Sequence, residues 1–158
     1  MTLDSKKLLD EVGWQILTVL QEDARLSYTE IGRRVGLSLP AVAERVRRME
    51  EAGIIIGYRA EIDVKKIGLG ITAFIRVATL SENYPALNSL LKSMPEVLES
   101  HHLAGADSFI VKVVASSIPH LEALITRLGP FGQTTTSVVL SSPVTQQTYR
   151  REAVKSEL

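Results

Sequence analysis

The chain has 158 residues, no net formal charge at pH 7, 45% hydrophobic residues and no cysteine. It lacks the run of about 18 apolar residues that a membrane-spanning helix requires, and its charged first residues do not resemble a secretory signal peptide. Disulfides and thiolate metal sites are excluded, so we expect a cytoplasmic protein of one or two small domains.

Three helices are predicted in the first third of the chain. Residues 10–21 carry an apolar residue at every fourth position, which is typical of an amphipathic helix. A second helix over 27–36 and a third over 38–53 each start at serine, a preferred N-cap, and end at glycine, a preferred C-terminal residue. Two short helices joined by a glycine-containing turn indicate a helix-turn-helix.

The third helix has the properties of a DNA-reading helix. Between Arg33 and Arg48 there are five arginines and one acid, Glu44, which gives a local charge of +4 in an otherwise neutral chain. Small residues at the start of this helix allow close approach to base edges, and arginines bind phosphate or guanine. A solvated basic helix of an all-α core is the alternative, and Arg45 has Glu50 as an alternative partner. The predicted DNA-binding residues are Ser27, Tyr28, Thr29, Ser38, Pro40, Ala41, Glu44, Arg45, Arg47 and Arg48.

A connector follows the helices. Three isoleucines and an alternating pattern over 54–63 predict a strand or short ribbon, either a wing or a connector. The glycines of 65–70 mark a boundary. We therefore assign 1–62 to a DNA-binding domain and 63–70 to a linker.

The second half predicts an α+β domain over 71–142. The expected order is strand, helix, strand, strand, helix, strand, which is the ferredoxin-like βαββαβ unit. The expected elements are strands 71–80, 97–104, 109–115 and 134–140 and helices 84–94 and 118–128, with a turn over 105–108. Residues 143–158 form a polar tail, expected to be extended, frayed or paired with another subunit.

Several segments carry a family resemblance across residues 9–140: LDEVGWQIL, LQEDARLSYTEIGRRVGLS, VAERVRRMEEAGIIIGY, AGADSFIVKV and TTTSVVL. In wording and spacing the chain resembles the Lrp/AsnC, or feast/famine, transcription regulators of bacteria and archaea. The resemblance implies a plain or winged helix-turn-helix and a ferredoxin-like RAM domain. It also implies homodimers that often assemble into octamers, with double-stranded DNA and an amino acid or similar metabolite as partners.

The resemblance also implies an effector site between RAM domains of adjacent subunits. Ala106 and Ser108 replace acids found in some relatives, and Gln133 and Thr135 replace arginines, so Asp107 is the remaining acid of the turn. Asp is also an ordinary turn residue. The expected effector-binding residues are Gly105, Ala106, Asp107, Ser108, Phe109, Thr134 and Thr136.

Neither a metal, another cofactor nor an enzymatic activity is expected. His101 and His102 are neighbours on a predicted strand, so their side chains face opposite sides and do not share one metal ion. Two alternatives remain. One is a sirohaem-decarboxylase-like enzyme using His101, His102 and Arg76, and the other is an architectural DNA-binding protein without an effector.

Assembly is suggested by the strands themselves. Both alternating sets of side chains in strands 71–80 and 109–115 include apolar residues, whereas two helices cover one face of a four-stranded sheet. We therefore expect the uncovered face to pack against a second copy of the chain.

Overall fold

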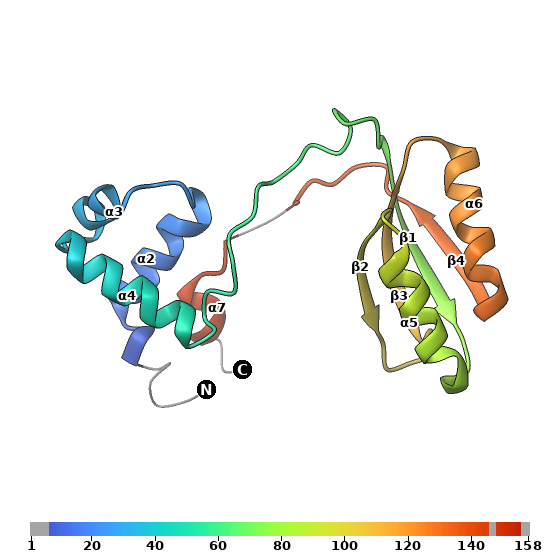
Figure 1. The fold of residues 1–158 in the computed structure, drawn as a ribbon, viewed down its shortest axis with the longest axis horizontal. Helices are drawn as coiled ribbons and strands as arrows, with labels where there is room; N and C mark the ends of the chain where they lie inside the picture. The colour runs from blue at the N-terminus through green and yellow to red at the C-terminus, as the bar shows by residue number, and fades with distance from the viewer. Residues whose placement is uncertain (1–6, 146–147, 156–158) are drawn as a thin grey trace. The chain divides into compact units, whose positions relative to one another are not determined.

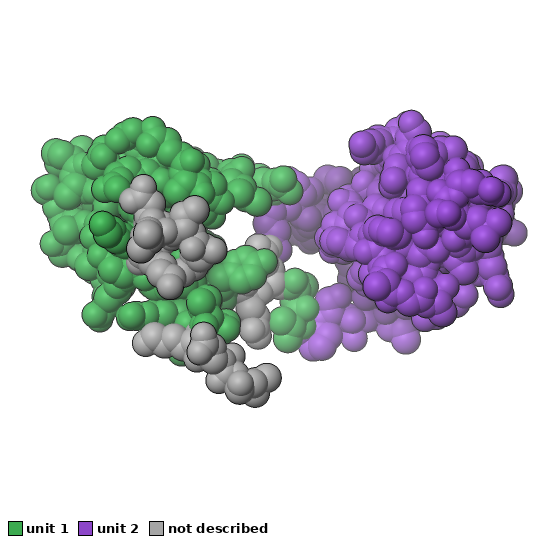
Figure 2. Space-filling model, turned by 90° about the horizontal axis from the view of Figure 1, so that it is seen from below, with its two compact units in different colours: residues 1–60, 144–158 green, residues 61–143 purple. Residues whose placement is uncertain are grey.

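The computed structural model describes residues 7–145 and 148–155. The chain forms two compact units, Met1–Ala60 with Val144–Leu158 and Glu61–Pro143 (Figure 2). The C-terminal residues, expected to form a separate tail, are therefore grouped with the first unit. Within the described ranges, the helices are too short or too polar to cross a membrane.

The N-terminal part of the first unit contains the helices α2 (Glu11–Glu22), α3 (Tyr28–Val35) and α4 (Leu39–Glu51) (Figure 1). Side-chain caps begin the first two. The Asp10 carboxylate accepts from Gly13 N at 2.7 Å, and Ser27 Oγ accepts from Glu30 N at 3.2 Å. This arrangement confirms the predicted trihelical helix-turn-helix.

The turn between α3 and α4 depends on two glycines. Gly36 has a φ of 72°, the left-handed conformation common at helix ends. Leu37 N donates to Gly32 O at 2.9 Å, and a Cβ atom on Gly32 would lie 2.3 Å from Leu37 O. Glycine at position 32 thus allows the two backbones to approach closely.

A small apolar core joins the three helices. Leu39 is 50% exposed, although its helical spacing from Val42 and Val46 places it on their side of α4. It is the first residue of α4 and lies beyond the packed core. The clustered core residues are Ile16, Leu20, Ile31, Val35, Val42 and Val46.

The strand or wing predicted over 54–63 is absent from the described structure. Ile54 N and Ile55 N instead both donate to Met49 O, at 2.9 and 3.2 Å, and so end α4. Ile56 is 91% exposed. An alternating segment becomes a strand only when it forms hydrogen bonds with a neighbouring strand. Within the described residues, no strand pairs with this segment.

The second unit is the predicted βαββαβ domain. Its strands are β1 (Ile71–Ala78), β2 (Val97–His102), β3 (Phe109–Ala115) and β4 (Gln133–Val138), and its longer helices are α5 (Tyr84–Ser93) and α6 (Ile118–Leu128). Short 3₁₀ turns cover Ser81–Asn83 and Gly129–Phe131. The sheet order is β2-β3-β1-β4 with antiparallel pairs, and this confirms the expected fold class.

One face of the sheet packs against both helices. The buried residues of the sheet alternate along β1 and β3, and leucines of α5 and α6 cover them. This core includes Ala73, Ile75, Val77, Val111, Val113, Leu87, Leu91, Leu121 and Leu124.

The opposite face is mixed rather than plainly apolar. Phe74 and Ile110 are half-buried there. They share the face with exposed Arg76 and with Lys112, whose Nζ lies 2.7 Å from Glu99 Oε1. The apolar area expected for assembly is therefore smaller than the alternation predicts.

The C-terminal segment contacts α2 of the first unit. Tyr149 N donates to Gln21 Oε1 at 2.7 Å, and Gln21 Nε2 donates to Tyr149 O at 3.2 Å. One side-chain amide thus satisfies both backbone groups of Tyr149, as a neighbouring strand would. A short helix, α7 (Arg151–Lys155), follows.

Candidate nucleic-acid interface and ligand site

The N-terminal ends of α3 and α4 carry most of the predicted DNA-binding residues on the surface. Ser27, Tyr28 and Thr29 begin α3, and all three are exposed. On α4, Ala41 is half-buried. The exposed residues at or on α4 are Ser38, Pro40, Glu44, Arg47 and Arg48.

Arg45 differs from the other predicted residues because it forms a bidentate ion pair with Asp10. Nη1 and Nη2 donate to Oδ1 and Oδ2 at 2.8 and 2.7 Å, which links α4 to the start of α2. The hydrogen bond from Arg45 lowers the pKa of the Asp10 carboxyl. The alternative pairing with Glu50 is wrong, because Glu50 accepts from the Tyr58 hydroxyl at 2.9 Å.

Arg47 is held by two carboxylates of its own helix. Its Nε and Nη2 donate to Glu44 at 3.0 and 2.8 Å, and its Nη1 donates to Glu51 at 2.5 Å. Hydrogen bonding from Arg47 lowers the pKa of Glu44. Both side chains of the Arg47–Glu44 pair are exposed, so solvent screens this ion pair.

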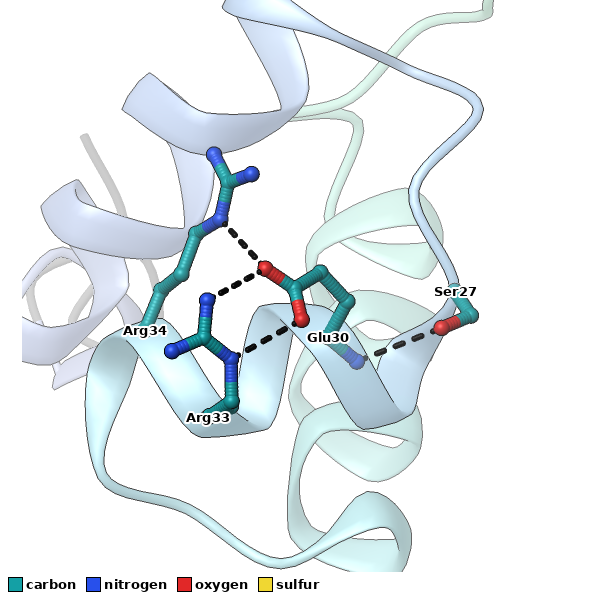
Figure 3. Close-up of polar contacts among 4 residues, drawn as sticks. All are labelled: Ser27, Glu30, Arg33 and Arg34. Atoms are coloured by element: carbon teal, nitrogen blue, oxygen red, sulfur yellow. Dashed lines mark hydrogen bonds and ion pairs between the residues drawn. The ribbon is translucent and has the colours of Figure 1, made fainter.

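Glu30 binds two arginines that are absent from the predicted set (Figure 3). Arg33 donates through Nε at 3.0 Å and Nη2 at 2.8 Å, and Arg34 donates through Nε at 3.0 Å. These hydrogen bonds lower the pKa of Glu30 to about 2. The sequence carries a signal for these ion pairs, because Arg33 and Arg34 follow Glu30 by three and four residues on one helix.

In the second unit, Ser108 and Phe109 are buried within the fold. The Ser108 hydroxyl donates to Thr79 O at 2.9 Å and accepts from Thr79 N at 3.2 Å. The Phe109 ring packs edge-on against Tyr84, with centroids 5.1 Å apart. Both side chains thus have structural contacts, whereas Gly105 and Ala106 are exposed.

The remaining predicted effector residues do not converge. Thr134 and Thr136 pair with Val77 and Ile75, so they lie on the helix-covered face, where both are half-buried. The Asp107 carboxylate lies 3.6 Å from the guanidinium of Arg76, which lies on the other face.

A shallow hollow of about 530 Å³ lies beside the turn. Asn83 Nδ2 donates to Thr79 Oγ1 at 3.3 Å on its wall. Its lining contains no charged residue, and of the predicted set it includes one residue, Ala106. The lining residues are Ala78, Thr79, Leu80, Asn83, Ala106, Gly129, Pro130, Phe131 and Gly132.

The residues nominated for decarboxylase chemistry do not gather at one point. His101 and Arg76 flank Ile110 on the same face of the sheet. His102 instead packs against the rings of Tyr84 and Phe109, with centroids 4.8 and 5.0 Å apart. Within residues 7–145 and 148–155, His, Asp and Glu side chains form no cluster suited to a metal ion.

Comparisons with known proteins match both units. The AsnC-type helix-turn-helix domain matches residues 9–50, and the Lrp/AsnC ligand binding domain matches residues 72–149. The HTH-type transcriptional regulator LrpC of Bacillus subtilis is 35% identical over 84% of this chain and 92% of its own length. The solved structure of B. subtilis LrpC superposes with a TM-score of 0.84 and 35% identity, covering 87% of this chain and 99% of that one.

A further neighbour was solved with a small molecule. The feast or famine regulatory protein of Mycobacterium tuberculosis, complexed with L-methionine, superposes with a TM-score of 0.78 and 29% identity. The match covers 89% of this chain and 99% of that chain.

Proposed function

Since the chain belongs to the Lrp/AsnC family of transcriptional regulators, we propose that α4 enters the DNA major groove and that an amino acid controls assembly or DNA binding. The helix-turn-helix unit binds DNA, and the βαββαβ unit is the ligand-binding domain. The surface of α4 carries the first part of the proposal, because apolar and small residues at its start are followed by arginines.

The start of α4 suits contact with base edges. Leu39 is half-exposed, and Pro40 and Ala41 follow it without a long polar side chain. An exposed leucine can contact a thymine methyl group, and small residues let the backbone come close. Leu39 thus joins the proposed contact residues, although its spacing assigns it to the core. The exposed start of α3, at Ser27, Tyr28 and Thr29, is suited to phosphate because helix N-termini attract anions.

Replacing Arg47 and Arg48 together with alanine should lower operator affinity at least about tenfold and leave the unit folded. If both contact phosphate, the slope of log affinity against log salt should fall by about one for each arginine. Fluorescence anisotropy with labelled duplex at several salt concentrations measures both quantities. Arg127→Ala removes an exposed arginine from α6 of the other unit and serves as the control. Unchanged binding by the double variant would argue against docking through α4.

We place the effector near the turn over 105–108, between copies of the chain. The turn has an exposed end at Gly105 and Ala106, one acid at Asp107, and the hollow beside Ala106. We further propose a homodimer that packs through the sheet face bearing Phe74 and Ile110 and assembles further, to an octamer. An amino acid then shifts this equilibrium only by binding one assembly better than another.

Thermal melting against the set of amino acids tests the effector. A ligand present at 100 times its Kd should add about 2.7 kcal/mol of stability, whereas an architectural protein without an effector shows no shift. Gly105→Trp should remove the shift and change oligomer size in light scattering, while the dimer still binds DNA. A Cβ atom at Gly105 meets nothing within 4 Å, but the φ of 150° is strained for any L-residue, so thermal melting of the variant verifies that it is folded. A shift and oligomer size equal to those of the parent protein would move the site elsewhere.

A further inference from the structure

Carboxylates of α3 and α4 hold exposed arginines on the two helices that carry the proposed DNA-binding residues. Arg33 binds Glu30, and Arg47 binds Glu44, in each case through Nε and Nη2 to the two carboxylate oxygens. Both pairs are three residues apart on an exposed helix face. The local charge of +4 already includes Glu44. Outside the counted stretch, Glu30 pairs with Arg33 and Arg34, and Asp10 pairs with Arg45.

These carboxylates occupy the edge of the guanidinium that a phosphate would use. Arginine binds phosphate and carboxylate in the same bidentate geometry, through parallel N–H groups. A phosphate that approaches Arg33 must therefore displace Glu30 or bind through the remaining nitrogen. Either event reduces the electrostatic gain of binding.

Of the two carboxylates, Glu30 holds its arginine partners more firmly than Glu44 does. Its carboxylate accepts three hydrogen bonds from two arginines, and its side chain is 31% exposed, against 55% for Glu44. The lowered pKa of Glu30, about 2, keeps this group ionised at any pH used for binding measurements. The competition therefore persists throughout the neutral range.

We propose that Glu30 is a specificity-determining residue, a competitor for phosphate that suppresses non-specific DNA binding by Arg33 and Arg34. Non-specific binding depends almost entirely on phosphate neutralisation, whereas a specific complex also gains contacts to bases. Base contacts let an operator complex form while Arg33 and Arg34 stay paired with Glu30, whereas random DNA offers only phosphate, so the competition falls mainly on random DNA. This inference rests on the proposed DNA-binding surface and extends it to Arg33 and Arg34.

The test is Glu30→Gln in the full chain, measured on two duplexes of equal length. One is an operator selected from a random library by the parent protein, and the other is a scrambled sequence. We expect affinity for the scrambled duplex to rise about tenfold and affinity for the operator to rise less than about threefold. The salt slope on the scrambled duplex should steepen by one to about two, one for each released arginine.

Two controls separate this role from a general change of charge or fold. Glu22→Gln removes the same charge at the end of α2, where the described residues include no arginine contact, and should leave both slopes unchanged. Adding Arg33→Ala and Arg34→Ala to Glu30→Gln should cancel the gain. Melting of each variant verifies that the first unit is folded.

The remaining outcomes distinguish the two proposals. If the parent binds its operator and the Arg47/Arg48 variant loses affinity, but Glu30→Gln changes neither slope nor scrambled-duplex affinity, the role of Glu30 is refuted. Weaker binding of both duplexes by Glu30→Gln also refutes it, and would assign Glu30 to positioning the arginines for phosphate. Failure of the Arg47/Arg48 variant to change binding instead overturns the docking surface itself.

Discussion

Replacing Ala41 by glutamate is expected to lower operator affinity by about a hundredfold or more while the first unit remains folded. Ala41 lies in the first turn of α4, which we propose to enter the major groove. A carboxylate there would face phosphates and base edges, and like-charge contact across an interface costs several kcal/mol. Anisotropy titration against operator duplex gives the affinity, and thermal melting gives the stability.

The matched control is Ala52→Glu. Ala52 is the exposed C-cap of the same helix, so the substitution introduces the same charge about three turns away from Ala41. Its affinity should stay within a few-fold of the parent. An equal loss in both variants would mean that net charge, rather than the position on α4, controls binding.

The second large effect is expected from Gly32→Ala, which should destabilise the helix-turn-helix by about 3 kcal/mol. The new Cβ atom would lie 2.3 Å from Leu37 O, a backbone atom of the residue whose N–H donates to Gly32 O. The melting temperature of the first unit should fall by roughly 12 to 24 °C, given about 4–8 °C per kcal/mol for small domains. Circular dichroism at the helical band follows this transition.

Gly36→Ala is the informative comparison. Gly36 has a φ of 72° but open space around a Cβ atom, so alanine there is strained without a clash. The expected cost is about 1 kcal/mol, the usual penalty for a left-handed L-residue. If the two alanine variants are equally destabilised, the close contact at Gly32 is not what limits this turn.

Local signals explain why most elements were predictable. The serine cap of α3 and the glycine after it define that helix, and the apolar spacing of α5 and α6 defines their buried faces. The prediction failed over 54–63, because alternation does not reveal whether a partner strand exists. There the isoleucines close the end of α4 through Met49 O.

Site details depended on contacts between distant residues. Arg45 binds Asp10 across 35 positions, and Ser108 binds Thr79 across 29. Neither contact has a signature in local sequence. By contrast, the pairing of Glu30 with Arg33 and Arg34 follows from helical spacing and was available from the sequence.

The contact between Gln21 and Tyr149 has a consequence for synthesis of the protein. The two residues are 128 positions apart, so at about 5–20 residues per second a ribosome takes roughly 6 to 25 seconds to make the intervening chain. The three helices share their own core and are free to fold early. The contact between Gln21 and Tyr149 forms only when the whole ligand-binding unit has been translated, so a prematurely terminated chain lacks it.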